Sequence, residues 1–289
     1  MTPTEHAAPT PGVEDTEAAP GKGSTSPALR VDGLRKTYPL PGGGRLTAAT
    51  GISFTVPHAG ALGIVGESGS GKSTVARMLV GLARPDAGRI EVDGRPRETR
   101  TPRRAAARLA RAREIQMVFQ DPYVSLDPHL TAADCLRTAL KLHGRPLDLA
   151  GSLLDQVGLG AREATARPSR LSGGQRQRLA IARALAVGPR VLVLDEAVAA
   201  LDVSIQAQIL QLLGEIREET GVALVFVSHD LAVVEHLTEE VLVMRKGEAV
   251  EQGPTAEVLS APAHPYTRLL LASVPREGWE PQLVSRLRG

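Results

Sequence analysis

A glycine-rich segment at residues 66–74 (GESGSGKST) has the residue types and spacing of a phosphate-binding loop. It matches the pattern G-x-x-x-x-G-K-[ST], in which glycines allow the backbone to fold around phosphate and direct several N–H groups inward. Lys72 would add a positive charge near the outer phosphates, and the hydroxyl of Ser73 is suited to binding Mg²⁺. The predicted nucleotide-binding residues are Gly66, Glu67, Ser68, Gly69, Ser70, Gly71, Lys72, Ser73 and Thr74.

Two carboxylates that follow a second apolar run could complete this site. Residues 191–196 read VLVLDE, which predicts a buried strand ending in Asp195 and Glu196. Ligands of open parallel sheets bind beyond the carboxyl ends of the strands. Asp195 is then placed to hold Mg²⁺, directly or through water, and Glu196 to orient and polarise an attacking water. Solvated charges at a strand end are the alternative, and the phosphate loop favours the catalytic interpretation.

The elements that must position these residues follow from the pattern of apolar runs. Buried strands are predicted at 61–65 (ALGIV), 190–194 (RVLVL) and 222–227 (VALVFV), and further strands at 89–92 and 115–119. The turn LPGGGR at 40–45 joins the runs 28–38 and 46–56 into a hairpin.

Helices are expected between these strands. They are predicted after the phosphate loop, over the basic, Ala-rich stretch 101–113, as several short pieces over 130–170, and where Ile205, Ile209, Leu212 and Ile216 share one face. Strands that alternate with helices indicate an α/β fold with a parallel sheet.

Composition narrows the class of protein. The 289 residues are 42% hydrophobic, as in a globular chain, and the formal net charge of +2 with 2% aromatics gives no reason to expect a nucleic-acid partner. Cys135 is the single cysteine, so a disulfide within the chain and a multi-cysteine metal cluster are excluded. No run approaches the roughly 20 apolar residues of a membrane span, and no signal peptide is recognised. We expect a cytoplasmic location and a disordered tail at residues 1–27.

A second glycine turn lies at residues 171–175 (LSGGQ), directly before the run RQRLAIARAL. Ser172 is a natural N-cap, and the N–H groups that follow would form a second anion site, although an ordinary capped helix has the same features. Here the sequence resembles the ABC ATPases, over nearly all of residues 29–275. The signature residues are Leu171, Ser172, Gly173, Gly174 and Gln175.

The resemblance implies a P-loop NTPase of the ABC type, with a parallel-sheet core, an antiparallel β subdomain and a helical subdomain at about 121–172. It also implies ATP and Mg²⁺ as cofactors. Two such domains pack head to tail, so that each ATP lies between the phosphate loop of one subunit and the signature of the other. Hydrolysis then releases the pair.

Other positions match the family residue by residue. Tyr38 resembles the aromatic residue that contacts adenine, with a core tyrosine as the alternative, and Gln120 resembles the glutamine that touches Mg²⁺ and senses the membrane partner. Asp202 resembles the loop that crosses the dimer interface, and His229 the histidine that contacts the γ-phosphate. Ala199 departs from the pattern because the family usually has serine there.

Three segments resemble the oligopeptide, dipeptide and nickel importer ATPases: FQDPYVSLDP at 119–128, LDVSIQAQIL at 201–210 and AHPYTRLLLASVP at 263–275. This implies an ATPase domain at 28–262, a C-terminal extension at 263–289, and a subunit that powers an importer of peptides or related solutes. A soluble ABC ATPase acting on nucleic acid or ribosomes, or an exporter subunit, is the alternative.

The partners implied are a second ABC ATPase subunit (the same chain or a homologous one), two transmembrane permeases and, indirectly, an extracellular solute-binding protein. The chain would then lie at the cytoplasmic face of the cell membrane. Residues 121–130 are predicted to meet the permease through Tyr123, Val124 and Leu126, unless these side chains pack inward instead.

Overall fold

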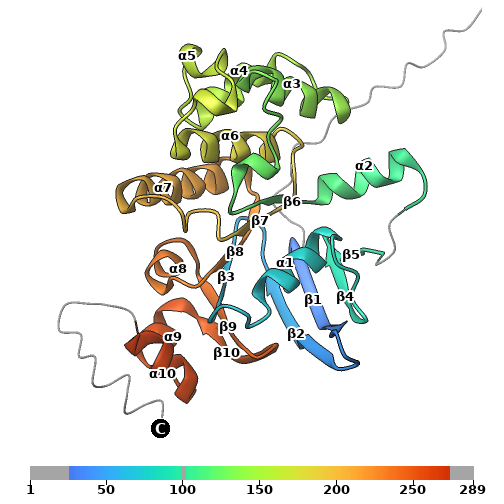
Figure 1. The fold of residues 1–289 in the computed structure, drawn as a ribbon, viewed down its shortest axis with the longest axis vertical. Helices are drawn as coiled ribbons and strands as arrows, with labels where there is room; N and C mark the ends of the chain where they lie inside the picture. The colour runs from blue at the N-terminus through green and yellow to red at the C-terminus, as the bar shows by residue number, and fades with distance from the viewer. Residues whose placement is uncertain (1–25, 99–101, 274–289) are drawn as a thin grey trace, which may run out of the picture.

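The computed structural model describes residues 26–98 and 102–273, which form two sheets and the helices that connect their strands. The larger sheet has the strand order β10-β9-β3-β8-β7-β6, in which all strands are parallel except the edge strand β10 (Figure 1). The predicted parallel core is therefore confirmed. Its strands are β3 (Ala61–Val65), β6 (Ile115–Val118), β7 (Val191–Asp195), β8 (Ala223–Ser228), β9 (Glu240–Arg245) and β10 (Glu248–Pro254).

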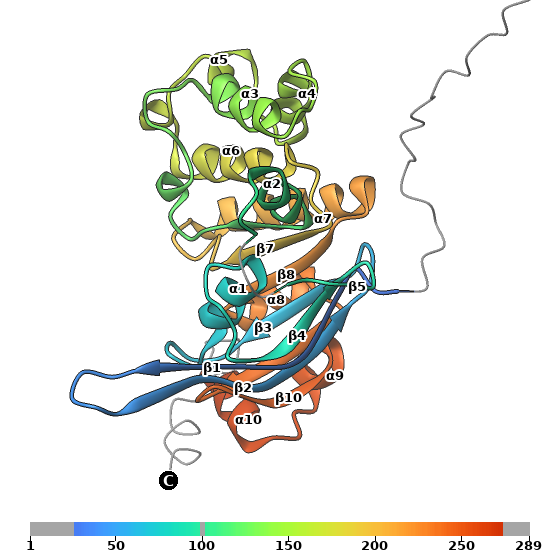
Figure 2. The same ribbon diagram turned by 90° about the vertical axis from the view of Figure 1, so that its right-hand side faces the viewer.

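The smaller sheet is antiparallel and has the order β2-β1-β4-β5. It contains β1 (Leu29–Pro39), β2 (Arg45–Val56), β4 (Ala87–Val92) and β5 (Arg95–Pro96). The predicted hairpin is β1 and β2, which extend together away from the rest of the domain in Figure 2. The strand predicted at 89–92 belongs to β4. It pairs antiparallel with β1, with Val31 opposite Ile90, and is not part of the parallel sheet.

The helix that follows the phosphate loop, α1 (Lys72–Val80), lies between the two sheets. Its buried residues Val75 and Met78 join a cluster with side chains of β1, β2 and one face of the parallel sheet. On β3, Leu62 and Ile64 belong to that cluster, whereas Ala61 and Val65 belong to the cluster on the opposite face. This alternation is what a strand covered on both faces requires.

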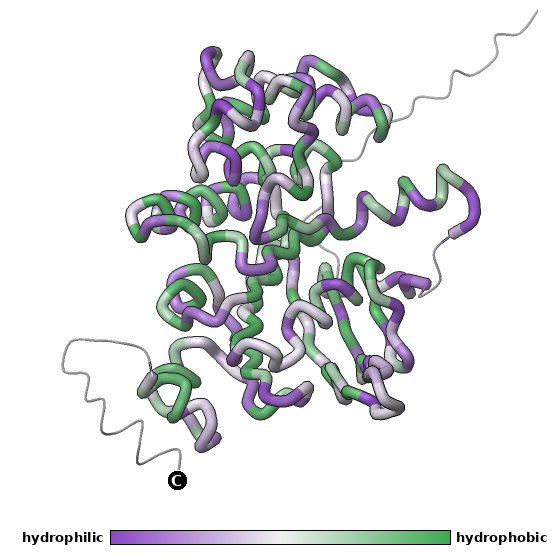
Figure 3. The backbone as a smooth tube through the Cα atoms, viewed as in Figure 1, coloured by the Kyte–Doolittle hydropathy of each residue, from purple (hydrophilic) through white to green (hydrophobic). Residues whose placement is uncertain are grey.

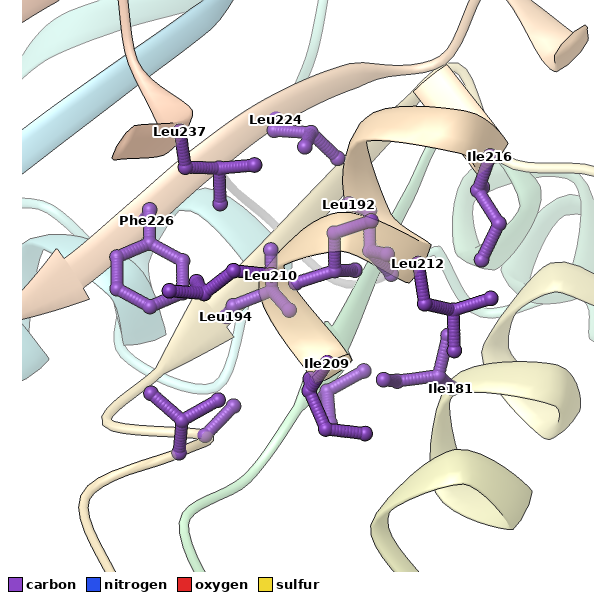
Figure 4. Packing of buried hydrophobic residues seen from close by; sticks show 14 of the residues in the cluster. Ile181, Leu192, Leu194, Ile209, Leu210, Leu212, Ile216, Leu224, Phe226 and Leu237 are labelled. Atoms are coloured by element: carbon purple, nitrogen blue, oxygen red, sulfur yellow. The ribbon is translucent and has the colours of Figure 1, made fainter. Parts of the chain in front are cut away.

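The opposite face of the parallel sheet is covered by α7 (Val203–Thr220) and α8 (Leu231–Leu237). Figure 4 shows the side chains that meet there: Leu192, Leu194, Leu224 and Phe226 of the sheet, Ile209, Leu210, Leu212 and Ile216 of α7, Leu237 of α8 and Ile181. Three of the four residues predicted on the α7 face are buried, and Ile205 is half-buried. Burying Phe226 fully contributes about 2–3 kcal/mol, and Figure 3 shows the central strands as mostly hydrophobic.

A helical region stands beyond one end of the sheet (Figure 1). It consists of α3 (Ala132–Leu142), α4 (Leu149–Gln156), α5 (Ala161–Ala164), the short 3₁₀ helix η2 (Pro168–Arg170) and α6 (Gly173–Leu185), as the predicted run of short helices requires. The basic helix α2 (Ala105–Glu114) buries none of its residues, which confirms a solvated helix there, although residue 101 lies outside the described residues.

The last described elements are α9 (Thr255–Ser260) and α10 (Pro265–Ala272), which lie beside β9 and β10. The proposed disordered tail at 1–27 lies outside the described residues except for its last two positions, and the C-terminal extension is described only as far as residue 273. Within 26–98 and 102–273, no helix has the length and apolar character needed to cross a membrane.

Candidate nucleotide site

The phosphate loop leaves β3 and enters α1 through backbone that only glycine adopts without strain. Gly66 has φ 149° and Gly71 has φ 107°. A Cβ atom on Gly66 would lie 2.2 Å from the carbonyl oxygen of Met244, and one on Gly71 would lie 2.0 Å from that of Ala48. The loop is therefore held between β9 on one side and β2 on the other, and its shape follows from packing as well as from sequence.

Lys72 is the cation at the centre of the loop. It is 4% exposed, and its Nζ donates to the carbonyl oxygens of Gly66 at 2.7 Å and Glu67 at 2.8 Å. Burial lowers the pKa of Lys72, and the carboxylates of Glu196, Asp195 and Glu67 oppose that shift. The ammonium group thus lies where the folded loop and the end of β7 converge.

The loop is joined directly to the acidic strand end. The hydroxyl of Ser73 donates to Oδ1 of Asp195 at 3.0 Å. Burial raises the pKa of Asp195, and the hydrogen bond from Ser73 opposes this. A hydroxyl and a carboxylate side by side are the hard oxygen ligands that Mg²⁺ takes when phosphate oxygens supply the rest. The described residues hold no group of three or more His, Cys, Asp or Glu that could bind a metal.

Glu196 and His229 lie together at the same edge. The N–H of Glu196 donates to the carbonyl oxygen of Val227 at 2.9 Å, and Oε1 of Glu196 is 3.5 Å from Nδ1 of His229. Glu196 has φ 50°, a left-handed conformation that is uncommon outside glycine. Gln120 is exposed at this edge, since β6 and β7 pair Val118 with Leu194 and Gln120 follows two positions later.

The signature segment begins α6 with a complete N-terminal cap. The hydroxyl of Ser172 accepts from the N–H of Gln175 at 3.2 Å, and the N–H of Ser172 donates to Oε1 of Gln175 at 2.9 Å. The predicted N-cap is confirmed and has the reciprocal form of a capping box. A Cβ on Gly174 would lie 2.6 Å from Cγ2 of Ile205, so glycine is needed where α6 approaches α7. Figures 1 and 2 both show α6 well apart from α1.

The structure gathers Lys72, Ser73, Asp195 and Glu196 with His229, and it leaves other predicted residues elsewhere. Tyr38 is half-buried near the far end of β1, outside both core clusters, and its ring is 5.3 Å from the ammonium of Lys36.

The loop before α7 is exposed at Ala199 and Asp202, whereas Ala197 and Val198 are buried. Asp202 is the N-cap of α7 but its side chain makes no capping hydrogen bond. Ala199 is exposed and its N–H donates to the carbonyl oxygen of Glu196 at 3.1 Å. The functional roles assigned to Tyr38, Asp202 and the signature stay predictions.

Two contacts at the site have no local signal in the sequence. The hydroxyl of Tyr266 accepts from the N–H of Glu67 at 3.0 Å, across 199 positions. The guanidinium of Arg176 in α6 lies 4.7 Å from the ring centre of Tyr123, in the 3₁₀ helix η1 (Pro122–Val124). Neither pair has a spacing that a sequence pattern reports, so only the folded structure reveals them.

The segment predicted to meet a permease divides into two parts. Val124 is 70% exposed and Tyr123 is 46% exposed, as a contact surface requires. The expectation for Leu126 was wrong, because this side chain is 4% exposed and packs in the larger core cluster.

A phosphate loop with a buried lysine, tied to the acidic end of a parallel strand, defines a nucleotide-binding protein of the P-loop class. A family model described as ABC transporter matches residues 49–199, and one described as the oligopeptide/dipeptide transporter C-terminal region matches residues 250–289. The chain belongs to the ABC transporter family and is an ATP hydrolase of that type.

Individual relatives cover most of the chain. The probable peptide ABC transporter ATP-binding protein y4tS of Sinorhizobium fredii is 46% identical over 264 residues, which are 86% of this chain and 72% of the relative. The oligopeptide transport ATP-binding protein OppD of Mycobacterium tuberculosis is 46% identical over 273 residues, 90% of this chain and 44% of OppD. The chain thus spans less than half the length of OppD.

Solved structures share the fold. CbiO1 of Clostridium perfringens, part of an ABC transporter complex, superposes with a TM-score of 0.72 at 29% identity, covering 82% of this chain and 92% of CbiO1. The ATP-binding cassette MJ0796, as a dimer in a post-hydrolysis state with ADP and phosphate, has a TM-score of 0.69 at 30% identity, covering 78% of this chain and 98% of its own. The predicted ABC-type fold is confirmed.

Proposed function

We propose that this ATPase powers the import of peptides or related small solutes across a membrane. The observation that carries the proposal is the match of residues 250–289 to the oligopeptide/dipeptide transporter C-terminal region, beside relatives whose names specify peptide or oligopeptide transport. Neither a cassette acting on nucleic acid or ribosomes nor an exporter finds support among these relatives.

In the proposed reaction, the loop N–H groups and Lys72 bind the β- and γ-phosphates of ATP. Glu196 orients and polarises the water that attacks the γ-phosphorus, the bond to the β–γ bridging oxygen breaks, and ADP and phosphate leave. His229, whose Nδ1 is 3.5 Å from Oε1 of Glu196, would contact the γ-phosphate. Ser73, Asp195 and Gln120 would hold Mg²⁺, which neutralises charge that develops on the phosphates.

A second cassette, the same chain or a homologous one, would complete the site. The signature N–H groups at the start of α6 would face the γ-phosphate bound by the partner, and Asp202 would lie at the interface. Support comes from the exposure of Ser172 and Asp202 and from the dimeric arrangement of the cassette MJ0796.

Two permease chains fed by an extracellular binding protein would supply the membrane part, with the cassette at the cytoplasmic face. The exposed Val124 and Tyr123 support docking through η1. Because Arg176 of α6 lies on the Tyr123 ring, a permease that moves η1 would also act on the helix that begins with the signature.

The test is uptake of labelled dipeptides, oligopeptides and nickel by cells that express the chain with permeases and a binding protein from the same genome. Val124→Glu should keep ATPase activity and melting temperature but abolish permease co-purification and uptake. Leu142→Glu is the matched control, because that side chain is 59% exposed on α3 and should change none of these. An active ATPase that supports uptake of none of these solutes would refute the import proposal.

A further inference from the structure

The hydrogen bond from Glu67 to Tyr266 acts on a peptide group that also accepts a hydrogen bond from Lys72. The N–H of Glu67 and the carbonyl of Gly66 belong to the same peptide group. Tyr266 accepts from that N–H at 3.0 Å, and Lys72 donates to that carbonyl oxygen at 2.7 Å. Because a peptide group is planar and rigid, fixing the direction of its N–H also fixes the direction of its carbonyl.

Tyr266 is itself firmly placed. Its side chain is 2% exposed, and the guanidinium of Arg245 lies 4.7 Å from its ring centre. Arg245 ends β9, which pairs with β3, the strand that leads into the phosphate loop. Burial raises the pKa of Tyr266, so its side chain stays protonated at physiological pH and accepts the Glu67 N–H as a neutral hydroxyl.

The residues before Tyr266 orient the helix that carries it. The carboxylate of Glu251 on β10 accepts from the N–H groups of Ala263 at 2.7 Å and His264 at 3.1 Å. Nδ1 of His264 then accepts from the N–H of Tyr266 at 3.1 Å and caps α10, where Pro265 occupies the first turn. The hydrogen bonds of the AHPY segment thus fix the start of α10 and the direction of the tyrosine toward the loop.

We propose that Tyr266 is a positioning residue for ATP binding. Through the Gly66–Glu67 peptide group it holds the ammonium of Lys72 in the position that contacts the phosphates. The C-terminal helix α10 thereby sets the geometry of the phosphate loop. This inference rests on the proposed role of Lys72 at the phosphates. It gives the C-terminal region a direct route to the nucleotide, besides any contact with other proteins.

The decisive variant is Tyr266→Phe in the full-length chain. It keeps the ring, its burial and its contact with Arg245, and it removes only the acceptor of the Glu67 N–H. We expect the Kd for ATP to rise about tenfold, the effect of losing one hydrogen bond that fixes geometry. Ser273→Ala is the control, since it removes a hydroxyl that donates to the carbonyl oxygen of Leu269 at the opposite end of the same helix and should leave ATP affinity unchanged.

A double-mutant cycle separates positioning from general damage. If Tyr266 acts through Lys72, Tyr266→Phe should change the Kd for ATP by less than twofold in a Lys72→Ala background. An equal tenfold loss in both backgrounds, or no loss in the wild-type background, would overturn the inference. An unchanged Kd in Lys72→Ala alone would instead show that the role proposed for Lys72 fails.

Discussion

The phosphate loop and the signature turn are both glycine-rich helix beginnings, yet the chain builds them in opposite ways. The phosphate loop is enclosed by β2 and β9, contains the buried Lys72 and is tied to Asp195 by Ser73. The signature turn caps α6 with its own Ser172 and Gln175, and Ser172 is exposed. The loop holds a buried cation beside the carboxylates at the end of β7, whereas at the turn Arg176 and Glu163 bond to the turn's own Leu171 and Gln175.

This difference indicates which of the two regions needs a second molecule to form its anion site. A site with its own cation and carboxylates has the groups to bind a nucleotide within one chain. A capped helix start becomes an anion site only when another molecule brings an anion to it. Substitutions in the loop should therefore change ATP binding by the single chain, and substitutions in the turn should change the association of two chains.

The largest effect should come from Glu196, which would act on an ATP bound between the loop of one chain and the turn of the other. Glu196→Gln should lower hydrolysis on the order of 1000-fold, since it removes the group that polarises water. ATP should still bind, and a dimer should accumulate with Mg²⁺-ATP, measured by gel filtration. Glu218→Gln, an exposed position on α7, is the control. Normal hydrolysis by Glu196→Gln would disprove the role given to this carboxylate.

Lys72→Ala tests the loop alone. Losing one preorganised donor should reduce ATP turnover on the order of 100-fold and weaken ATP binding by the single chain. Calorimetric titration with ATP measures the binding. Lys141→Ala on the exposed surface of α3 should leave binding intact. Near-normal activity of Lys72→Ala would contradict the phosphate-site interpretation.

Ser172→Asp and Ser172→Asn test the turn alone. Both residues cap helices as well as serine does, so folding should be preserved in both. The aspartate also places a negative charge toward the partner's phosphate, and such a pair near a surface costs up to roughly 4 kcal/mol. Dimerisation with ATP should therefore weaken at least tenfold more in Ser172→Asp than in Ser172→Asn. Equal dimerisation of the two would mean that the turn faces no anion.

The smallest effects should be on stability, with opposite signs in the two regions. Ser172→Ala should destabilise the chain by about 1 kcal/mol, because it removes the cap. Asp195→Asn should instead raise the melting temperature measured without nucleotide, because burial raises the pKa of Asp195 and its charge is costly in the folded state.

The pH dependence of that gain follows from linkage. A carboxyl whose pKa is raised on folding contributes most below its unfolded value, near 3.8, and the contribution is lost as pH rises through the folded value. The difference in melting temperature between Asp195→Asn and the wild-type chain should therefore grow from acid pH toward neutral pH. A difference that shrinks with rising pH would contradict the buried environment of Asp195.

The sequence predicted the parts of the molecule that local patterns encode. Apolar runs placed β3, β7 and β8, and the motif placed Lys72 and Ser73 at the start of α1. The meeting of Ser73 with Asp195 followed from the rule that parallel strands share a carboxyl edge.

What local patterns could not supply was the set of contacts between distant segments. Leu126 has the same apolar character as Val124, and only packing decides that one is 4% exposed and the other 70%. Two further contacts join segments that lie far apart in the sequence: the pairing of β4 with β1 and the hydrogen bond between Tyr266 and Glu67. Single-sequence reasoning reports periodicity and spacing, and neither carries that information.

The left-handed backbone of Glu196 has a consequence for how this chain would change over generations. The left-handed conformation costs a residue with a Cβ roughly 1–2 kcal/mol. Glycine avoids this cost, and asparagine tolerates the conformation better. As long as hydrolysis is under selection, the carboxylate is retained despite the strain. A duplicated copy that needs only to bind ATP should accumulate Gly or Asn at this position. The substitution that removes its hydrolytic activity would also increase the stability of its folded state.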